Sequence, residues 1–207
     1  MQIQLLRGDF INYSYTEDRT YADIDDRFLR NTYMALDFLT RTNALTIQFE
    51  DEDELKRVDI VDILVADTEH NITIVPGNRN AYNHRLNSIM FLDTHGAMFR
   101  KNHKKRWFRR NKGYNSPVAL LSHELIHCYN ELFQSDEYIH RKSDHSHRGQ
   151  KIDYDGRDLS FPNAEEAFVI KMTNQVAKHL GEDKRSNYGR SYYPVQDVLS
   201  TKRIRKN

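Results

Sequence analysis

The chain has 207 residues, 38% of them hydrophobic, and its formal net charge is only +1. A chain of this length can bury roughly 70% of the surface it exposes when unfolded, so it needs no disulfide bonds to be stable. The single cysteine, Cys128, cannot form an internal disulfide bond, which excludes a disulfide-stabilised scaffold and suits a reducing compartment.

Neither a secretory signal nor a membrane span is visible. The N-terminal MQIQLLRGDF lacks the apolar run of a signal peptide, and no stretch approaches the roughly 18 apolar residues of a membrane helix. We therefore expect a soluble protein that does not insert into membranes. If it is exported, it uses a route that does not depend on a cleavable signal.

The first half of the chain predicts a hairpin, a helix and three strands. Residues 2–15 alternate apolar and polar side chains, which indicates a hairpin. Residues 22–41 place apolar side chains at helical spacing. Three short apolar segments predict strands at 58–66, 71–76 and 88–93.

Two runs of like charge interrupt this pattern. Residues 50–62 carry seven acidic and two basic side chains, and residues 100–112 carry eight basic side chains and no acidic one. Runs of this kind are usually solvated loops. The basic run is also suited to bind an acidic protein surface. Nucleic acid is the less favoured partner, because only Trp107 and Phe108 add aromatic side chains to the run.

A buried helix is predicted at 117–133, where the sequence reads PVALLSHELIHCYNELF. Ser116 is a good N-cap, and Pro117 suits the first helical position. Cys128 is expected to be a small core residue within this helix. The side chains that recur on one face, and that should pack into the core, are Val118, Leu121, Leu125, Tyr129 and Leu132.

The same helix carries the pattern His-Glu-Leu-Ile-His. His123 and His127 are four residues apart, so both imidazoles can point to one spot, which suits two of the four positions around zinc. Glu124 is one step further round and can reach a water that the metal activates, without binding the metal itself. The pattern therefore predicts a zinc site with Glu124 as the general base.

A catalytic zinc needs one more protein ligand. The extended pattern with a histidine six residues after His127 fails, because Phe133 stands there. A carboxylate in the first turn of a helix is favoured by the helix dipole and held rigidly, whereas a histidine in a polar loop is more simply solvated. The residues alone therefore favour the next helix without choosing between its two glutamates. The candidates are His140, His145, His147, Glu165 and Glu166.

That next helix is predicted at 164–180. Asn163 is a good N-cap, Gly181 follows the end, and Glu165 and Glu166 lie in the first turn. Strands therefore come first along the chain and helices later, which predicts an α+β fold. No linker of proline and glycine divides the chain, so we expect a single domain over 1–207.

Two Arg-x-x-Tyr pairs follow the second helix. One is Arg185 with Tyr188, and the other is Arg190 with Tyr193. Such a pair supplies a cation and a hydroxyl group, both of which can stabilise the oxyanion that forms when a peptide bond is hydrolysed. The spacing alone does not decide between the two pairs.

The HELIH helix, the Glu-Glu pair about forty residues later and the Arg-x-x-Tyr spacing together resemble the gluzincin peptidases. They are distantly similar to the light chains of clostridial neurotoxins and more similar to the NleD-like zinc metalloprotease effectors of bacterial pathogens. The resemblance covers about 88–188 and implies a compact zincin-like domain with a small N-terminal β-sheet and a catalytic core at about 88–193. It also implies that Glu166 is the third zinc ligand and that Arg185 and Tyr188 form the transition-state pair.

The function implied by this resemblance is a monomeric endopeptidase with one zinc ion per chain. It would be delivered into the cytoplasm of a eukaryotic host cell, where it cleaves a host protein. By analogy with other zincins, the strand at 88–93 is expected at the sheet edge, where it pairs with the substrate backbone. The alternative is a zinc protein without catalytic activity, with His145 or His147 as fourth ligand, that binds an acidic partner through 100–112.

Overall fold

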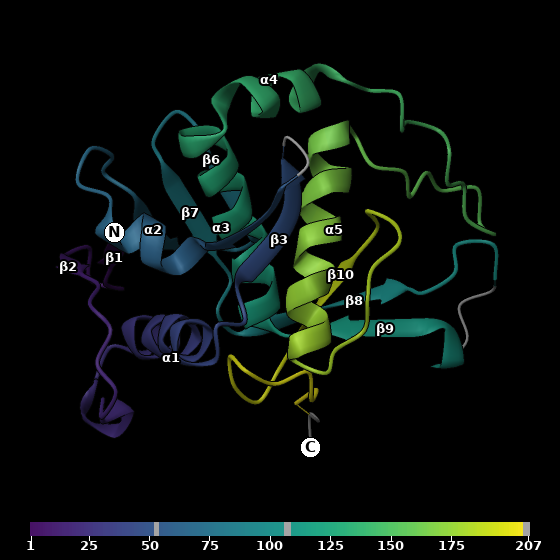
Figure 1. Cartoon of the computed structure of the whole chain (residues 1–207). Coiled ribbons are helices and arrows are strands. Elements are labelled where there is room, and N and C mark those ends of the chain that lie inside the picture. Colours follow the sequence, from purple (N-terminus) through teal and green to yellow (C-terminus); the bar gives the residue numbers. More distant parts are fainter. Residues whose placement is uncertain (52–53, 106–108, 205–207) are drawn as a thin grey trace.

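The structure is a computed structural model that describes residues 1–51, 54–105 and 109–204. It confirms the predicted α+β class: within these residues, five α-helices pack with three β-sheets (Figure 1). Two of the helices, α3 and α5, lie side by side near the middle of the molecule, and α4 crosses above them in the view of Figure 1.

The largest sheet has the strand order β2-β1-β5-β7-β6. The predicted N-terminal hairpin is confirmed, because β1 (Gln2–Gln4) and β2 (Phe10–Asn12) pair in antiparallel fashion. Gly8 allows the turn between them, with a φ of +103° that side-chain-bearing residues rarely adopt. β5 (Thr73–Pro76) and β7 (Ser88–Phe91) pair in parallel and confirm the strands predicted at 71–76 and 88–93.

The expectation that residues 88–93 form the edge of this sheet is wrong. β7 lies between β5 and the three-residue strand β6 (Ala81–Asn83), with which it pairs in antiparallel fashion. The last strand in the order is therefore β6, which packs against α3. β6 was not predicted, because its three half-buried residues show no alternation of buried and exposed positions.

The strand predicted at 58–66 is wrong over most of its length. β4 (Glu54–Asp59) ends within it, and α2 (Ile60–Ala66) follows at once. The Asp59 carboxylate caps this helix by accepting a hydrogen bond from the backbone N–H of Asp62 at 3.2 Å. A short apolar run is ambiguous between strand and helix, and here the buried side chains have helical spacing: Ile60, Val61 and Leu64.

The acidic run at 50–62 is not the solvated loop that we expected. β3 (Thr46–Asp51) pairs with β4 as an antiparallel hairpin, and these two strands form a sheet of their own. The run thus contributes the end of β3, the whole of β4 and the start of α2.

The third sheet contains β8 (His95–Arg100), β9 (Lys112–Asn115) and β10 (Ser191–Pro194), in the order β10-β8-β9. The basic run connects β8 to β9, so its two ends belong to strands rather than to a loop. Arg100 is buried and forms ion pairs with Asp153, at 3.4 Å, and with Asp155. Trp107 and Phe108 lie outside the described residues.

The helices follow their capping signals. α1 (Arg27–Thr42) begins after Asp26, five residues later than predicted, because a short 3-10 turn at Tyr21–Asp23 precedes it. α3 (Pro117–Phe133) and α5 (Ala164–His179) confirm the two later helices, whereas α4 (Ser135–Ser143) was not predicted. Within the described ranges, none of the helices is both long and apolar enough to cross a bilayer.

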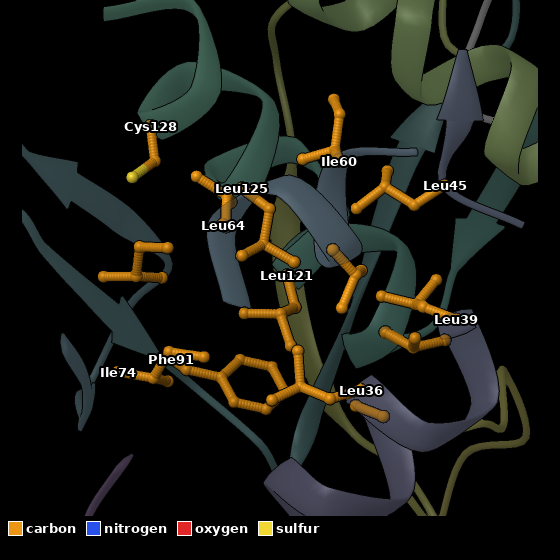
Figure 2. Packing of buried hydrophobic residues seen from close by; sticks show 14 of the residues in the cluster. Leu36, Leu39, Leu45, Ile60, Leu64, Ile74, Phe91, Leu121, Leu125 and Cys128 are labelled. Atoms are coloured by element: carbon orange, nitrogen blue, oxygen red, sulfur yellow. The ribbon is translucent and has the colours of Figure 1, made fainter. Parts of the chain in front are cut away.

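The hydrophobic core lies between α1, α2, α3 and the large sheet. Figure 2 shows Leu36 of α1 close to Phe91 of β7 and Leu121 of α3, while Leu39 of α1 lies on the side of Leu45. The predicted core stripe of α3 is confirmed: Leu132 packs half-buried against the core, and the other four members are buried in it. Cys128 is buried as well. α3 is therefore fixed by apolar contacts on the face away from its histidines.

Candidate metal centre

The two predicted ligand-bearing helices meet where their polar side chains lie. His123 and His127 are buried on α3, and the first turn of α5 carries Glu165 and Glu166. Asn163 begins α5 by accepting a hydrogen bond from the backbone N–H of Glu166 at 3.0 Å. This cap fixes the turn from which both carboxylates extend.

Three side chains converge on one point. The Glu166 Oε2 atom lies 3.3 Å from His123 Nε2 and 3.5 Å from His127 Nε2. Ligand atoms of all three residues lie within 4.8 Å of one another. Zinc–ligand bonds of about 2.1 Å in a tetrahedron place ligand atoms roughly 3.4 Å apart. His123, His127 and Glu166 thus form a group that is able to hold a metal ion.

Each imidazole is oriented by a partner on its other nitrogen. The Thr173 hydroxyl donates to the Val169 carbonyl at 2.8 Å, so its oxygen accepts from His123 Nδ1 at 3.3 Å. His127 Nδ1 donates to Glu165 Oε1 at 3.2 Å. Both rings therefore direct Nε2 at Glu166, which is the arrangement that second partners impose on metal-binding histidines.

Glu165 and Glu166 consequently have different environments. Glu165 is completely buried and accepts hydrogen bonds from Asn130 Nδ2 at 2.9 Å and from Arg141 Nε at 2.6 Å, in addition to the one from His127. Glu166 retains partial exposure and belongs to the group that can hold a metal. Geometry thus separates two glutamates that residue types alone left as alternatives.

The charges of these groups are strongly coupled. Burial lowers the pKa of His123, while burial of His127 is outweighed by its hydrogen bonds with Glu165 and Glu166, which raise its pKa to about 9. Burial acts to raise the pKa of Glu166, but hydrogen bonds with both histidines outweigh it and hold that pKa well below its usual range. The carboxylate of Glu166 is therefore ionised and available as a ligand.

The metal-binding group opens into a cavity of about 110 Å³. Glu124 lines it beside the two histidines, as the HELIH spacing predicts, and Tyr188 and Arg190 line it from the chain that leads to β10. Burial disfavours the charge of Arg190, but several electrostatic interactions, the largest of them with Glu124, together outweigh burial and raise the Arg190 pKa. Arg190 thus lies within electrostatic reach of the predicted general base.

The structure does not bring Arg185 and Tyr193 into this cavity. Arg185 is buried, donates from Nη2 to the Tyr188 carbonyl at 2.8 Å, and packs over the Phe99 ring. Tyr193 donates its hydroxyl hydrogen to the Thr201 carbonyl at 2.8 Å. The members of the two Arg-x-x-Tyr pairs that lie at the site are therefore Tyr188 and Arg190, one from each pair.

Among the described residues, the metal-binding group contains none of the three histidines that we considered as third ligands. His140 lies on α4, and His145 Nδ1 donates to the Pro162 carbonyl at 2.9 Å. Sequence reasoning missed several residues that line the cavity, because β6 and α4 were not predicted. They are Asn80, Ala81, Tyr82, His84, Tyr138 and Lys142.

Comparison of the chain with protein-family models, curated proteins and solved structures returned no match.

Proposed function

We propose that the chain is a zinc-dependent endopeptidase of zincin-like architecture, with His123, His127 and Glu166 holding one zinc ion. The observation that carries this proposal is the convergence of the three ligand atoms in a cavity that also contains Glu124. Three protein ligands leave one coordination position for water or substrate, which is typical of catalytic rather than structural zinc.

A zinc ion held there would polarise a carbonyl group and lower the pKa of water towards 7. Glu124 takes a proton from the attacking water and passes it to the amine that leaves. The Tyr188 hydroxyl and the Arg190 guanidinium lie on the same cavity, where they can donate to the oxyanion of the tetrahedral intermediate. Arg185 donates a hydrogen bond to the backbone carbonyl of Tyr188. In this proposal Arg185 therefore positions the loop, and Arg190 takes the oxyanion-stabilising role that was predicted for Arg185.

β6 is the strand suited to bind the substrate backbone. It is the last strand of the large sheet among the described residues, and Ala81 and Tyr82 line the cavity. An extended peptide that added to this edge would lie beside the cavity of the metal-binding group. We therefore propose β6, and not the strand at 88–93, as the strand that pairs with the substrate backbone.

The substrate and its location are proposed from the resemblance to NleD-like effectors. In this view the chain is a monomer that is exported from a bacterium and cleaves a protein in the host cytoplasm. The alternative of a non-catalytic zinc protein is less favoured, because a structural site normally has four protein ligands. In the part of the chain that the structure describes, the group has three.

The test is a comparison of wild type with Glu124→Gln, both loaded with zinc and incubated with a proteome-derived peptide mixture. We expect wild type to generate new peptide ends, and Glu124→Gln to generate them about 10²- to 10⁴-fold more slowly, because the general base is lost. Elemental analysis should find one zinc per chain in both proteins. Glu137→Gln, which changes an exposed glutamate on α4, is the matched control.

Two results would contradict the proposal. One is cleavage by Glu124→Gln at the wild-type rate. The other is a folded wild-type protein that takes up no zinc, or a Glu166→Ala variant that retains as much zinc as wild type.

A further inference from the structure

Two cations border the cavity that holds the metal-binding group. Lys142 comes from the last turn of α4, and Arg190 comes from the residues just before β10. The exposed imidazole of His84 lies at the same cavity, from the turn after β6. None of the three belongs to the predicted zinc motif, and Lys142 and His84 have no role in the mechanism proposed above.

Lys142 is adjacent to Arg141 but differs from it in its partners. Arg141 binds the buried carboxylate of Glu165 at 2.6 Å. Lys142 is exposed, lies 5.5 Å from the centre of the Tyr138 ring, and forms no ion pair with any carboxylate of the described ranges. Its ammonium group is therefore available to a ligand that enters the cavity.

Arg190 also has unused binding capacity. Its Nη1 atom is buried and has no hydrogen-bond partner among the described residues, while its guanidinium lies 6.0 Å from the Tyr188 ring centre and 5.5 Å from that of Tyr192. A buried donor without a partner is unfavourable unless a ligand supplies an acceptor. The aromatic rings hold the guanidinium in place for such a ligand.

Neighbouring aspartates do not neutralise Arg190. Arg190 also borders a larger cavity of about 530 Å³ that contains Asp153, Asp155 and Asp158. The first two form ion pairs with Arg100, and Asp158 accepts backbone hydrogen bonds from Ser160 and Gly149. Among the described residues, none of the three aspartates forms an ion pair with Arg190.

The charge balance then favours an anion. Glu124 and Glu166 contribute two negative charges to the cavity of the metal-binding group, and a divalent metal ion would offset both. Arg190 and Lys142 would remain as two uncompensated positive charges. Like charges gathered in a cleft attract ligands of the opposite sign.

We propose that this cavity selects peptide segments that carry an anionic side chain, which binds to Lys142 and Arg190 beside the metal-binding group. The proposal rests on the proposed endopeptidase function and defines the class of substrate. The shared chemistry is a negative charge on an extended peptide, supplied either by aspartate and glutamate or by a phosphorylated side chain.

The test measures binding and cleavage separately. Zinc-loaded Glu124→Gln is titrated with three fluorescein-labelled nonapeptide pools that have Glu, phosphoserine or Gln at the centre and no other acidic residue. We expect the Glu or phosphoserine pool to bind about two- to fivefold more tightly than the Gln pool, the range that one exposed ion pair provides. Introducing Lys142→Ala into the Glu124→Gln protein should remove most of this preference, and introducing Lys142→Glu should reverse it.

Lys178→Ala is the matched control, because Lys178 is an exposed lysine in the last turn of α5 and does not line the cavity. Cleavage of a proteome-derived peptide mixture by wild type should show acidic or phosphorylated residues near the cleaved bonds. The Lys142→Ala variant should lose this enrichment, and Lys178→Ala should retain it.

The outcomes separate the inference from the function on which it rests. Cleavage without any preference for anionic residues, or a preference unchanged in Lys142→Ala, overturns the inference and leaves the endopeptidase intact. Binding of the anionic pools through Lys142 without cleavage by wild type supports the selectivity of the cavity and overturns the endopeptidase.

Discussion

Glu165 and Glu166 are neighbours in sequence, but they act on opposite sides of His127. Glu166 faces Nε2 of the ring at 3.5 Å, and Glu165 faces Nδ1 at 3.2 Å. Glu165 also accepts hydrogen bonds from the side chains of Asn130 and Arg141. One carboxylate can thus bind a metal, while the other keeps the ring in the orientation that metal binding needs.

We predict that Glu165→Ala weakens both the fold and the metal site. The change leaves the largely buried Arg141 and the buried Asn130 without their acceptor, which should cost about 2–4 kcal/mol of unfolding free energy. Because His127 loses its orienting partner, zinc affinity should fall about 10- to 100-fold. Urea unfolding of the zinc-free protein and competition with a chelator measure the two effects.

A matched control for this prediction is Glu137→Ala, which removes an exposed glutamate from the first turn of α4. It should change the unfolding free energy by no more than about 0.5 kcal/mol. If Glu165→Ala behaves like this control in zinc affinity, then Glu165 has no part in positioning His127.

Zinc binding should depend on pH through one proton of His127. Its pKa is raised from 6.5 to about 9, whereas the pKa values of His123 and Glu166 are lowered, so near neutral pH only His127 of the three ligands must lose a proton to bind zinc. Apparent zinc affinity should therefore rise about tenfold per pH unit between pH 7 and pH 8. Calorimetry in two buffers with different ionisation heats should find one proton released per zinc.

Loss of the His127 proton favours zinc binding, but it lowers the stability of the zinc-free fold. Since the folded-state pKa of His127 is raised, its stabilising contribution is complete below pH 6.5 and is lost as the pH rises through about 9. Zinc affinity that stays constant from pH 7 to pH 8 would show that His127 is already neutral in the folded protein.

For single residues, the sequence predicts side-chain positions that depend on helical periodicity. It does not predict positions that depend on the path of a loop. The spacing of four residues is enough to place His123 and His127 together, because a helix has a fixed geometry. The choice of Arg190 over Arg185 depends on how the chain turns after α5. There Arg185 is drawn inwards by hydrogen bonds to Asn174 and to the Tyr188 carbonyl, which no spacing rule describes.

Among the elements, the start of α5 determines the geometry of the site. The Asn163 side chain caps the helix at 3.0 Å from the backbone nitrogen of Glu166 itself. The cap therefore stabilises the helix and also fixes the direction in which the ligand leaves it.

We predict that Asn163→Ala costs about 1 kcal/mol of unfolding free energy, the usual value of an N-cap. Zinc affinity should fall as well, because the first turn of α5 frays and Glu166 becomes less well positioned. Asn163→Ser is the control, since serine caps helices about as well as asparagine and adds no charge beside the metal. Equal zinc affinity in Asn163→Ala and wild type would mean that packing alone holds the turn.

Elements were predictable where caps and long periodicity agreed. α3 and α5 combine both signals, and both lie where the sequence places them. The run at 58–66 is too short for a long periodicity, and its Asp59 cap makes most of it a helix. β6 and α4 have only weak local signals, because β6 has three residues and α4 has a single buried side chain, Tyr138. Tertiary packing, not propensity, stabilises elements of this kind.

In the whole molecule, the hydrophobic core and the metal-binding group lie on different faces of α3. Leu121 and Leu125 pack among side chains of α1, α2 and the large sheet (Figure 2), while the histidines face α5. The core contains many large, fully buried side chains, so its stability comes from buried apolar area and not from metal ligands. The fold should therefore persist when the metal is removed.

Removal of zinc by a chelator should distinguish a catalytic zinc ion from a structural one. Treatment with 1,10-phenanthroline should remove zinc and abolish peptide cleavage, while far-UV and near-UV circular dichroism at 25 °C remain those of a folded protein. The loss of a bound ion that had been present at 100 times its dissociation constant lowers the unfolding free energy by about 2.7 kcal/mol, so the thermal midpoint should fall without loss of the cooperative transition. Readdition of zinc should restore both.

Three features of the structure support this expectation. The group has three ligands among the described residues, the ligands come from two helices that already pack against each other, and the interactions of His127 with both glutamates remain available without a metal. A structural zinc would instead connect segments that have no other contact, and its removal would unfold them. Cooperative loss of helix on chelation at 25 °C would therefore favour the non-catalytic alternative, and the assignment of Glu124 as a general base would fall with it.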